Sequence, residues 1–561
     1  MELRTCDRAA ASPLCHRNHN TDSSPSNIDI GQDEDMISTL PDHLLLGILE
    51  RLHLREALRV GAASTRWRHL PHQLSHLELR VDQFHGATPV EIMDAFTGAA
   101  RRLLSVCPPP CPACSRAIKT LVLHFYMSDP LQLSSIGGGV EDVVSRGETE
   151  WLEFYILPPA SSNSNTTQLL AEMGQAQRFM SFSRACPVAF RWLTRLTLEN
   201  LAFGDDDVAG LIKACDKLKH LILISCRLVD LHSALKIDTP CSGLQELQFI
   251  DFACTCIELI SVPQLREILC WSWPCESPPL RFGHVPQLLE ASLRSRARVW
   301  QTPFALSECL SATNLSRLYL NFGCEMIWIQ LEHSKHLTTI FRNLTDVYLY
   351  CIFPECDLNW TMFIVEAAPA LLNFTLFRNQ HPCVKPSEYS SQKTNMLWEP
   401  SKDWKHLNLK LLVMAGFEDE DKVTNYLRLF MERAVGLKRI ELRGKHPCDE
   451  CNAMDLELES TRSLVDKASR TFYVRTTINY YSSSFSEMLM KFVTELDTGL
   501  MVIHGRTQRR FLLIVFLVGK EHLQCHVRLP AEAAVGLHLR LQLDGVEDSL
   551  LLNGLFDLGE L

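Results

Sequence analysis

The sequence predicts an α/β protein in which a small helical unit is followed by a long solenoid of repeated strands and helices. From Met36 onward, apolar residues recur at intervals of three and four, which is the period of a helix with one apolar face. Farther along, the spacing L-x-x-L-x-L returns many times, and successive copies begin about 21 to 29 residues apart. A chain of 561 residues is long enough to hold both parts.

The repeated spacing predicts one short strand for each copy, because alternate side chains of a strand point to the same side. Clear copies begin at Leu193, Leu218, Leu244, Leu315, Leu344, Leu371, Leu409 and Leu437. Weaker copies begin at Leu74, Ile118, Trp151, Leu265 and Leu288. This spacing and period are typical of leucine-rich repeats, whose units stack on one another and bury a continuous core.

Residues between the apolar positions are expected on the concave surface of the solenoid, and they include Arg195, Tyr319 and Tyr348. Segments between the strands, such as Asp205 to Lys217, have helical spacing and are expected on the convex side. The interval between the copies at Leu371 and Leu409 is longer than the others, which predicts an inserted loop there.

The N-terminal region changes character at Met36. Residues 1–35 are polar and contain few large apolar side chains, so they are expected to be disordered. The next segment predicts a helix over Leu40 to Leu52, with Pro41 in its first turn and Thr39 as its cap. A second helix is expected over Arg55 to Trp67. So small a helical unit usually needs a partner surface or a neighbouring domain to be stable.

The string from Ile37 to Leu70 contains Leu-Pro, spaced leucines, an Arg-Glu-Ala step and a closing Trp-Arg-x-Leu, and it resembles the F-box motif. Together with the repeats, the chain looks like a plant F-box/leucine-rich-repeat protein. The segment from Leu407 to Leu458 is similar to the C-terminal FBD-like region of that family, including His-Pro-Cys-x-x-Cys at residues 446–451.

The pattern and the resemblance together predict five regions. They are a disordered tail over 1–35, an F-box over 36–78, a leucine-rich-repeat solenoid over 79–405, FBD-like repeats over 406–460 and an unassigned tail over 461–561. Within that last tail, the apolar run from Phe511 to Gly519 is much shorter than the ~20 residues needed to span a bilayer. It therefore predicts a buried strand.

The resemblance implies that the F-box docks on a Skp-type adaptor, which is tied to a cullin scaffold, while the repeats hold a protein to be ubiquitinated. Such a receptor performs no chemistry and needs no cofactor. The positions that match the family's adaptor contacts are Leu40, Pro41, Leu44, Leu45, Ile48, Leu49, Leu52, Leu54 and Trp67. The sequence departs from the family at Gly61, Ala62 and Ala63, where bulkier aliphatic residues are usual. Because glycine costs about 1 kcal/mol relative to alanine within a helix, a weaker F-box is expected.

Composition narrows the choice of partners and compartment. The formal net charge of −11 and the isoelectric point near 6.0 disfavour binding to nucleic acid. The 21 cysteines are spread along the chain, and residues 1–20 contain no apolar run of signal-peptide length. The chain is therefore expected in the cytosol or the nucleus, without a membrane partner.

Two alternatives stay open at this point. The repeats could hold a partner without any ligase, if the small residues at 61–63 weaken the adaptor contact. A zinc-dependent hydrolase is the other, because His76, Glu78, Cys111 and Cys114 formally match the H-x-E and P-C-x-x-C signature of zinc deaminases. Against this alternative, His76 and Glu78 fall on an expected repeat strand.

Structural zinc is a separate possibility that the sequence offers at two places. One set comprises Cys107, Cys111 and Cys114, and the other comprises His446, Cys448 and Cys451. A fourth ligand is not evident for the first set, and a single C-x-x-C pair is weak support for the second. No metal site is therefore predicted.

Overall fold

The computed structural model describes most of the chain between residues 40 and 528. The described ranges are 40–63, 66–104, 117–158, 165–273, 278–295, 303–325, 327–353, 356–378, 398, 404–417, 420–443, 499–507, 510–519 and 522–528. Contacts divide the chain into two compact units, Met1–Pro71 and His72–Leu561. The expected tail over residues 1–35 lies outside the described residues.

The first unit contains two helices, α1 (Asp42–Leu49) and α2 (Leu54–Ala63). Pro41 takes the N-cap position of α1 rather than its first turn, and the expected cap Thr39 lies outside the described residues. Helix α2 ends earlier than Trp67, since Arg66 to His69 form a turn. Leu45, Leu49, Ala57 and Leu70 are fully buried and supply the unit's apolar core.

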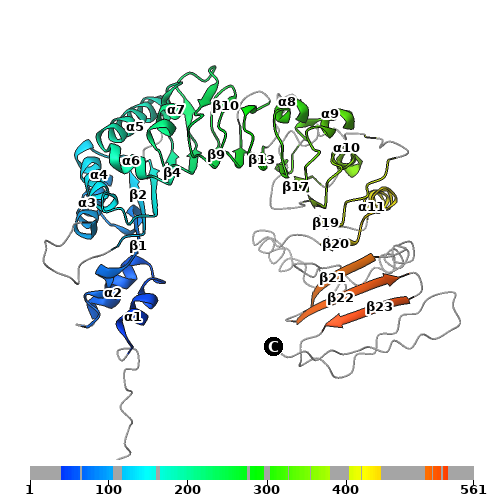
Figure 1. Cartoon of the computed structure of the whole chain (residues 1–561), viewed down its shortest axis with the longest axis horizontal. Coiled ribbons are helices and arrows are strands. Elements are labelled where there is room, and N and C mark those ends of the chain that lie inside the picture. The colour runs from blue at the N-terminus through cyan, green and yellow to red at the C-terminus, as the bar shows by residue number, and fades with distance from the viewer. Residues whose placement is uncertain are drawn as a thin grey trace, which may run out of the picture. The chain divides into compact units, whose positions relative to one another are not determined.

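The second unit is built on a ladder of parallel strands that pair in chain order (Figure 1). The strands of the ladder are β1 (His76–Arg80), β2 (Thr120–Tyr126), β3 (Trp151–Leu157), β4 (Arg195–Glu199), β6 (His220–Ile224), β9 (Glu246–Ile250), β11 (Glu267–Trp271), β13 (Glu290–Arg294), β15 (Arg317–Asn321), β17 (Asp346–Ile352), β18 (Asn373–Arg378), β19 (Leu411–Ala415) and β20 (Arg439–Arg443). After β20 come β21 (Gly499–Thr507), β22 (Arg510–Gly519) and β23 (His522–Arg528), of which β22 and β23 are antiparallel to their neighbours.

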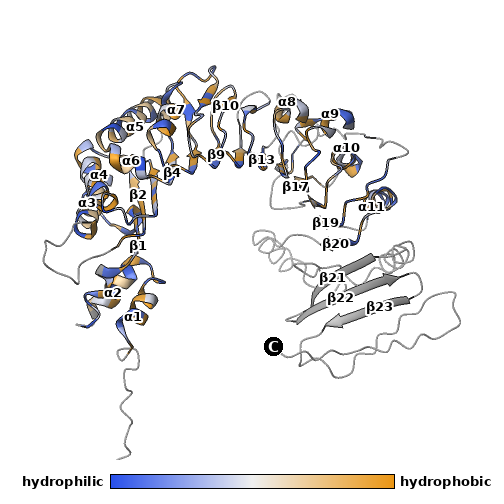
Figure 2. Ribbon diagram, in the orientation of Figure 1, coloured by the Kyte–Doolittle hydropathy of each residue, from blue (hydrophilic) through white to orange (hydrophobic). Residues whose placement is uncertain are grey.

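Side chains alternate between buried and partly exposed along most of these strands, and the buried ones form two columns through the ladder. One column runs through Leu79, Leu123, Phe154, Leu196, Leu221, Leu247, Ile268, Ala291, Leu318, Val347, Phe374, Leu412 and Ile440. The other begins at Phe125 and Ile156 and ends at Met414 and Leu442. Apolar and polar residues alternate along the ribbon of the ladder in Figure 2. Each strand therefore covers the apolar residues of its neighbours.

Helices lie on one side of the ladder (Figure 1). They are α3 (Pro89–Leu104), α4 (Pro130–Val144), α5 (Asn165–Ala185), α6 (Pro187–Trp192), α7 (Asp207–Ala214), α8 (Leu306–Leu310), α9 (Ser334–Thr338), α10 (Met362–Ala367) and α11 (Asp421–Arg433). Short 3₁₀ turns occur at η1 (Leu70–Gln73), η2 (Val81–Gln83) and η4 (Leu358–Thr361). The opposite side of the ladder carries the partly exposed side chains, and we call it the open face.

In the shortest repeats the segment between two ladder strands forms a strand, although a helix is expected between the strands from the sequence. Strands β8 (Leu235–Asp238), β10 (Ile257–Ser261) and β12 (Leu280–His284) form a separate parallel sheet there. Smaller two-stranded sheets pair β5 (Ala202–Phe203) with β7 (Arg227–Leu228), and β14 (Phe304–Ala305) with β16 (Ile329–Gln330). An extended strand crosses the repeat with fewer residues than a helix needs, because it rises more than twice as far per residue.

The chain turns away from several strands through a residue in the left-handed conformation. Asn200, Ser225, Asp251 and Ser272 have φ between 48° and 60° and directly follow β4, β6, β9 and β11. Each of their N–H groups donates a hydrogen bond of 2.6–3.0 Å to the last carbonyl of the next strand. Asparagine and aspartate tolerate this conformation better than most residues, and the bond gained offsets the strain at serine.

The α/β solenoid expected from the sequence is confirmed, and the weaker copies at Leu74, Ile118, Trp151, Leu265 and Leu288 all lead into strands of the ladder. Strands β19 and β20 continue the same ladder. The expected F-box boundary after residue 78 falls within β1, whereas the first compact unit ends at Pro71. The run from Phe511 to Gly519 forms most of β22, as expected of a strand. In the part of the chain that the structure describes, no helix is long and apolar enough to cross a membrane.

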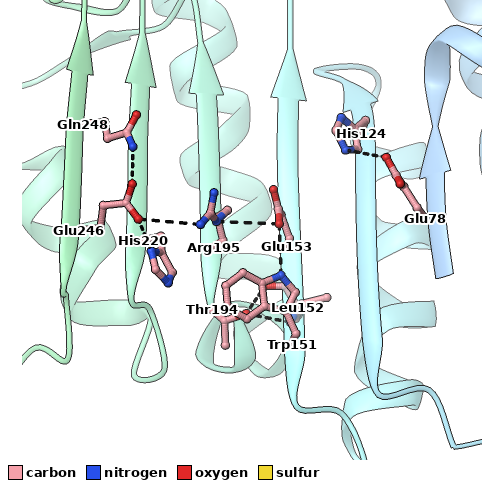
Figure 3. Close-up of polar contacts among 10 residues, drawn as sticks. All are labelled: Glu78, His124, Trp151, Leu152, Glu153, Thr194, Arg195, His220, Glu246 and Gln248. Carbon is pink, nitrogen blue, oxygen red and sulfur yellow. Dashed lines mark hydrogen bonds and ion pairs between the residues drawn. The ribbon is translucent and has the colours of Figure 1, made fainter. Parts of the chain in front are cut away.

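Thr194 joins neighbouring repeats by a buried pair of hydrogen bonds. Its hydroxyl accepts from the N–H of Leu152 at 2.9 Å and donates to the carbonyl of the same residue at 2.7 Å. Figure 3 draws this pair at the beginning of β3, beside Trp151.

We expect Thr194→Val to destabilise this part of the ladder by about 1–3 kcal/mol, because two buried backbone groups lose their partner while the shape is kept. Hydrogen exchange over β3, followed by mass spectrometry, measures the effect. The matched control is Thr197→Val on β4, a change of the same kind at a threonine that is also buried. Equal exchange in the two variants would contradict the assigned role of Thr194.

Candidate interaction surfaces

An exposed apolar ridge lies on the first unit. It consists of Pro41, Leu44, Ile48 and Leu52, which are three or four residues apart and therefore share one face of α1 and its flanks. The exposed fractions of Leu44, Ile48 and Leu52 are 48%, 43% and 37%. Apolar side chains that stay exposed together on so small a unit are typical of an interaction site.

The structure divides the sequence-predicted adaptor contacts into three groups by their exposure. The four ridge residues are exposed, and Leu40, Leu54 and Trp67 are half-buried. Leu45 and Leu49 are fully buried in the core, so they support the helix rather than offer a contact surface. The spacing of three and four residues fits both the exposed and the buried leucines of this short helix. It therefore does not distinguish the side that packs on α2 from the side that faces outward. The adaptor contact itself stays a prediction.

Arg66 fixes the start of α1 to the turn that follows α2. Its Nη2 donates to the carbonyl oxygen of Leu40 at 2.5 Å and to Oδ1 of Asp42 at 3.1 Å. Both side chains of the Arg66–Asp42 pair are about half exposed, so the ion pair itself adds little stability. No local sequence pattern points to this role of Arg66, because its partners lie 24 and 26 residues away.

Gly61 allows α2 to approach Pro71. A Cβ atom at Gly61 would lie 2.6 Å from Cγ of Pro71, which is closer than atoms of this kind approach. The close approach of Pro71 thus favours glycine at this position, whereas the expected weakening of the F-box by Gly61 stays a prediction. A bulkier aliphatic residue at this position would displace the proline ring.

The open face of the second unit carries a polar row on its first half (Figure 3). Arg195 on β4 lies 4.0 Å from the carboxylate of Glu153 and 3.8 Å from that of Glu246. His220 Nδ1 lies 2.5 Å from Oε2 of Glu246, and Gln248 donates to the other oxygen. The hydrogen bond from His220, helped by Gln248 and by the charge of Arg195, holds the pKa of Glu246 below its usual value.

Farther along the open face, aromatic side chains stack across neighbouring strands. The rings of Tyr319 and Tyr348 are 4.4 Å apart and nearly parallel, and those of Tyr350 and Phe377 are 4.5 Å apart. Arg294 lies over the ring of Trp271, with its guanidinium carbon 3.9 Å from the centroid. Tyr319 and Tyr348 were expected on this surface from the sequence, and they lie on it.

The residues of the hypothetical zinc hydrolase site are described only in part. His76 and Glu78 lie on β1, as expected of a repeat strand, and Glu78 faces His124 at 3.6 Å. Cys107, Cys111 and Cys114 lie outside the described residues, as do His446, Cys448 and Cys451. Within the described ranges, no group of three or more His, Cys, Asp or Glu side chains is placed to hold a metal ion.

We expect Gly61→Ala to destabilise the first unit by about 1–3 kcal/mol, because the clash with Pro71 outweighs the gain in helix propensity. The control is Gly47→Ala on α1, where nothing lies within 4 Å of the added Cβ; there we expect a gain of about 1 kcal/mol. Hydrogen exchange over Leu54–Ala63 and Asp42–Leu49 reports both changes. Slower exchange of α2 in Gly61→Ala would show that the close approach is unimportant.

Comparison with known proteins supports this architecture. The model of a family described as At1g61320/AtMIF1, LRR domain, matches residues 178–483, which is more than half of the chain. The F-box/LRR-repeat protein At3g03360 of Arabidopsis thaliana is 26% identical over 225 residues, covering 39% of this chain and 44% of the relative. The putative F-box protein At1g49610 of the same plant is 25% identical over 201 residues, covering 35% and 46%.

A further relative matches over a shorter segment with a higher sequence identity. The F-box protein At1g80960 of Arabidopsis thaliana is 54% identical over 43 residues, which cover 8% of this chain and 9% of the relative. In each of these comparisons the match spans less than half the length of the relative. With the stacked repeats and the family match together, the chain belongs to the plant F-box/leucine-rich-repeat proteins, and its repeats belong to the LRR domain family of At1g61320/AtMIF1.

Proposed function

We propose that this protein is the substrate-recognition subunit of a cullin-type ubiquitin ligase. The first unit docks on a Skp-type adaptor through its apolar ridge, and the ladder binds the protein to be ubiquitinated. The observation that carries the proposal is the exposure of Leu44, Ile48 and Leu52 beside a core that already buries Leu45 and Leu49. The unit thus buries one set of apolar side chains in its own core and exposes a second set at its surface.

The energetics suit a protein interface of this kind. A fully buried leucine or isoleucine contributes about 1.5–3 kcal/mol, and the ridge residues are still one-third to one-half exposed. Covering three of them with a complementary surface supplies several kcal/mol, which suffices for a specific contact when neighbouring residues exclude water. Arg66 and Gly61 act indirectly, since they hold α1 and α2 in the positions that form the ridge.

On this proposal the receptor carries out no catalytic step. It brings a bound protein near the ubiquitin-transferring subunits of the assembly. It therefore acts by raising the effective concentration of that protein at those subunits. The names of its relatives, which are F-box and F-box/LRR-repeat proteins, support this role. A place in the cytosol or the nucleus follows as part of the same proposal, because ubiquitin ligases of this class act there.

The decisive variant is Leu44→Asp/Ile48→Asp, which alters the ridge without touching the buried core. We expect it to weaken binding of a purified Skp-type adaptor by at least about 100-fold, or about 2.7 kcal/mol, because it places two carboxylates in an apolar contact. Isothermal titration of the full chain measures the dissociation constant. Leu45 is unsuitable for this test, since its substitution would unfold the unit.

The matched control is Leu131→Asp on α4, where an exposed leucine of the second unit is replaced in the same way. It should leave adaptor binding unchanged. If the unaltered chain binds no adaptor, or if the ridge variant and the control bind equally, the ligase role is wrong. The repeats would then act as a binding platform without a ligase.

A further inference from the structure

The second half of the open face, from β9 to β18, carries a row of carboxylates that lie in register. Glu246, Glu267 and Glu290 are direct partners on adjacent strands β9, β11 and β13. Neighbouring strands are about 4.8 Å apart, so the three side chains start close together. Like charges in such a position repel one another, which makes this row unfavourable unless a cation approaches it.

Arginines lie at the two ends of the row. Arg195 lies 3.8 Å from Glu246 at one end, where His220 also hydrogen-bonds to that carboxylate, and Nε of Arg317 lies 2.7 Å from Oε2 of Glu290 at the other. Glu267, in the middle, is exposed and has no ion pair among the described residues. Burial, with the nearby charges of Glu267 and Glu246, raises the pKa of Glu290 even though Arg317 opposes this.

The aromatic stack lies directly beside the carboxylate row. Tyr319 is the register partner of Ser292, which stands two residues after Glu290 on β13. Burial and the charge of Glu290 raise the pKa of Tyr319. The ring spacing of 4.4 Å between Tyr319 and Tyr348 is near the strand spacing, so the rings face each other along the ladder.

The balance of charge on this part of the open face is negative. Its outward side chains include four carboxylates, from Glu246, Glu267, Glu290 and Asp346, against two guanidinium groups, from Arg294 and Arg317. Both guanidinium groups are already engaged, Arg317 with Glu290 and Arg294 with the ring of Trp271. Arg195 on β4 pairs with Glu246 and Arg317 pairs with Glu290, so among the described residues only Glu267 and Asp346 of these four have no ion pair. An anionic partner would be repelled by these two carboxylates, whereas a cationic partner would neutralise them.

Taken together, these features favour one kind of occupant. We propose that the open face from β9 to β18 binds a protein segment that carries lysine or arginine beside apolar or aromatic residues. The cations lie against the row of Glu246, Glu267 and Glu290, and the apolar residues contact the stack of Tyr319, Tyr348, Tyr350 and Phe377. This inference rests on the proposed function, because it names the class of target segment that the ladder would present for ubiquitination.

Physical chemistry supports the pairing of these two contacts. Arginine and lysine are attracted both to carboxylates and to the electron-rich faces of aromatic rings. Half-buried tyrosines supply large contact area at a low cost in conformational entropy. Because the charges are partly exposed, the attraction should weaken as ionic strength rises.

Selection from a random peptide library tests the proposal without assuming any particular target protein. Twelve-residue peptides displayed on phage are selected against the purified full chain, and a synthetic peptide carrying the selected consensus is then titrated. We expect the selected peptides to be enriched in lysine and arginine. Selection of no peptide, or of peptides that are neutral or acidic, would overturn the proposal.

Two variants then locate the site. Glu267→Lys should weaken binding of the synthetic peptide at least tenfold, because it reverses the charge at the centre of the row. Tyr348→Ala should weaken it severalfold through loss of the stack. The control Glu308→Lys makes the same charge change at an exposed residue of α8, on the helical side of the same region, and should have little effect. Equal effects of Glu267→Lys and Glu308→Lys would place the peptide elsewhere.

Adaptor binding, measured on the same samples, separates this inference from the proposed function. Glu267→Lys should bind the Skp-type adaptor as the unaltered chain does. If adaptor binding holds and the peptide results fail, only the class of target is wrong. If basic peptides bind this face and the adaptor does not bind the ridge, the ligase role fails instead.

Discussion

The register of the parallel ladder is the constraint on which the rest of the second unit depends. One repeat cannot bury its own apolar residues, so each strand must lie beside a neighbour with the same alternation of side chains. A shift of one residue in any pairing would turn a column of leucines toward water and bring a row of charges into the core. The two buried columns therefore determine which side chains of each strand point outward, and so which residues lie on the open face.

Because the buried columns hold the strands together, the open face can carry interactions that are unfavourable by themselves. Carboxylates on adjacent strands repel one another, and in an isolated sheet they would loosen the pairing. Here the buried columns and the interstrand hydrogen bonds keep Glu246, Glu267 and Glu290 in register regardless. Local features that oppose the fold in this way commonly mark functional positions. The fold thus keeps these carboxylates in register in spite of their mutual repulsion.

The first unit follows a different physical rule. Its two helices have little apolar surface to bury, and their arrangement depends on a close approach at Gly61 and on hydrogen bonds from Arg66. Its core takes up Leu45 and Leu49 but leaves Leu44 and Ile48 exposed among the described residues, so a complementary surface could bury more apolar area. The ladder, by contrast, buries its own core.

The repeated strands, their spacing and the presence of a separate helical unit could be predicted from the sequence alone. Periodicity suffices for this, because the position of each buried residue along a strand or a helix is set by local geometry. Reading the same position of successive copies side by side would also have found the row of Glu246, Glu267 and Glu290. The F-box resemblance correctly indicated the family, and it named the ridge residues together with two core leucines.

Which residues of distant segments face one another depends on the tertiary structure. Arg66 and Leu40, Gly61 and Pro71, and Thr194 and Leu152 are distant in sequence, and no local pattern links them. The replacement of helices by β8, β10 and β12 likewise depends on how neighbouring repeats pack. Periodicity carries information about the direction of a side chain relative to its own backbone. Contacts between distant segments depend on the packing of the whole ladder or unit, which the sequence pattern alone does not specify.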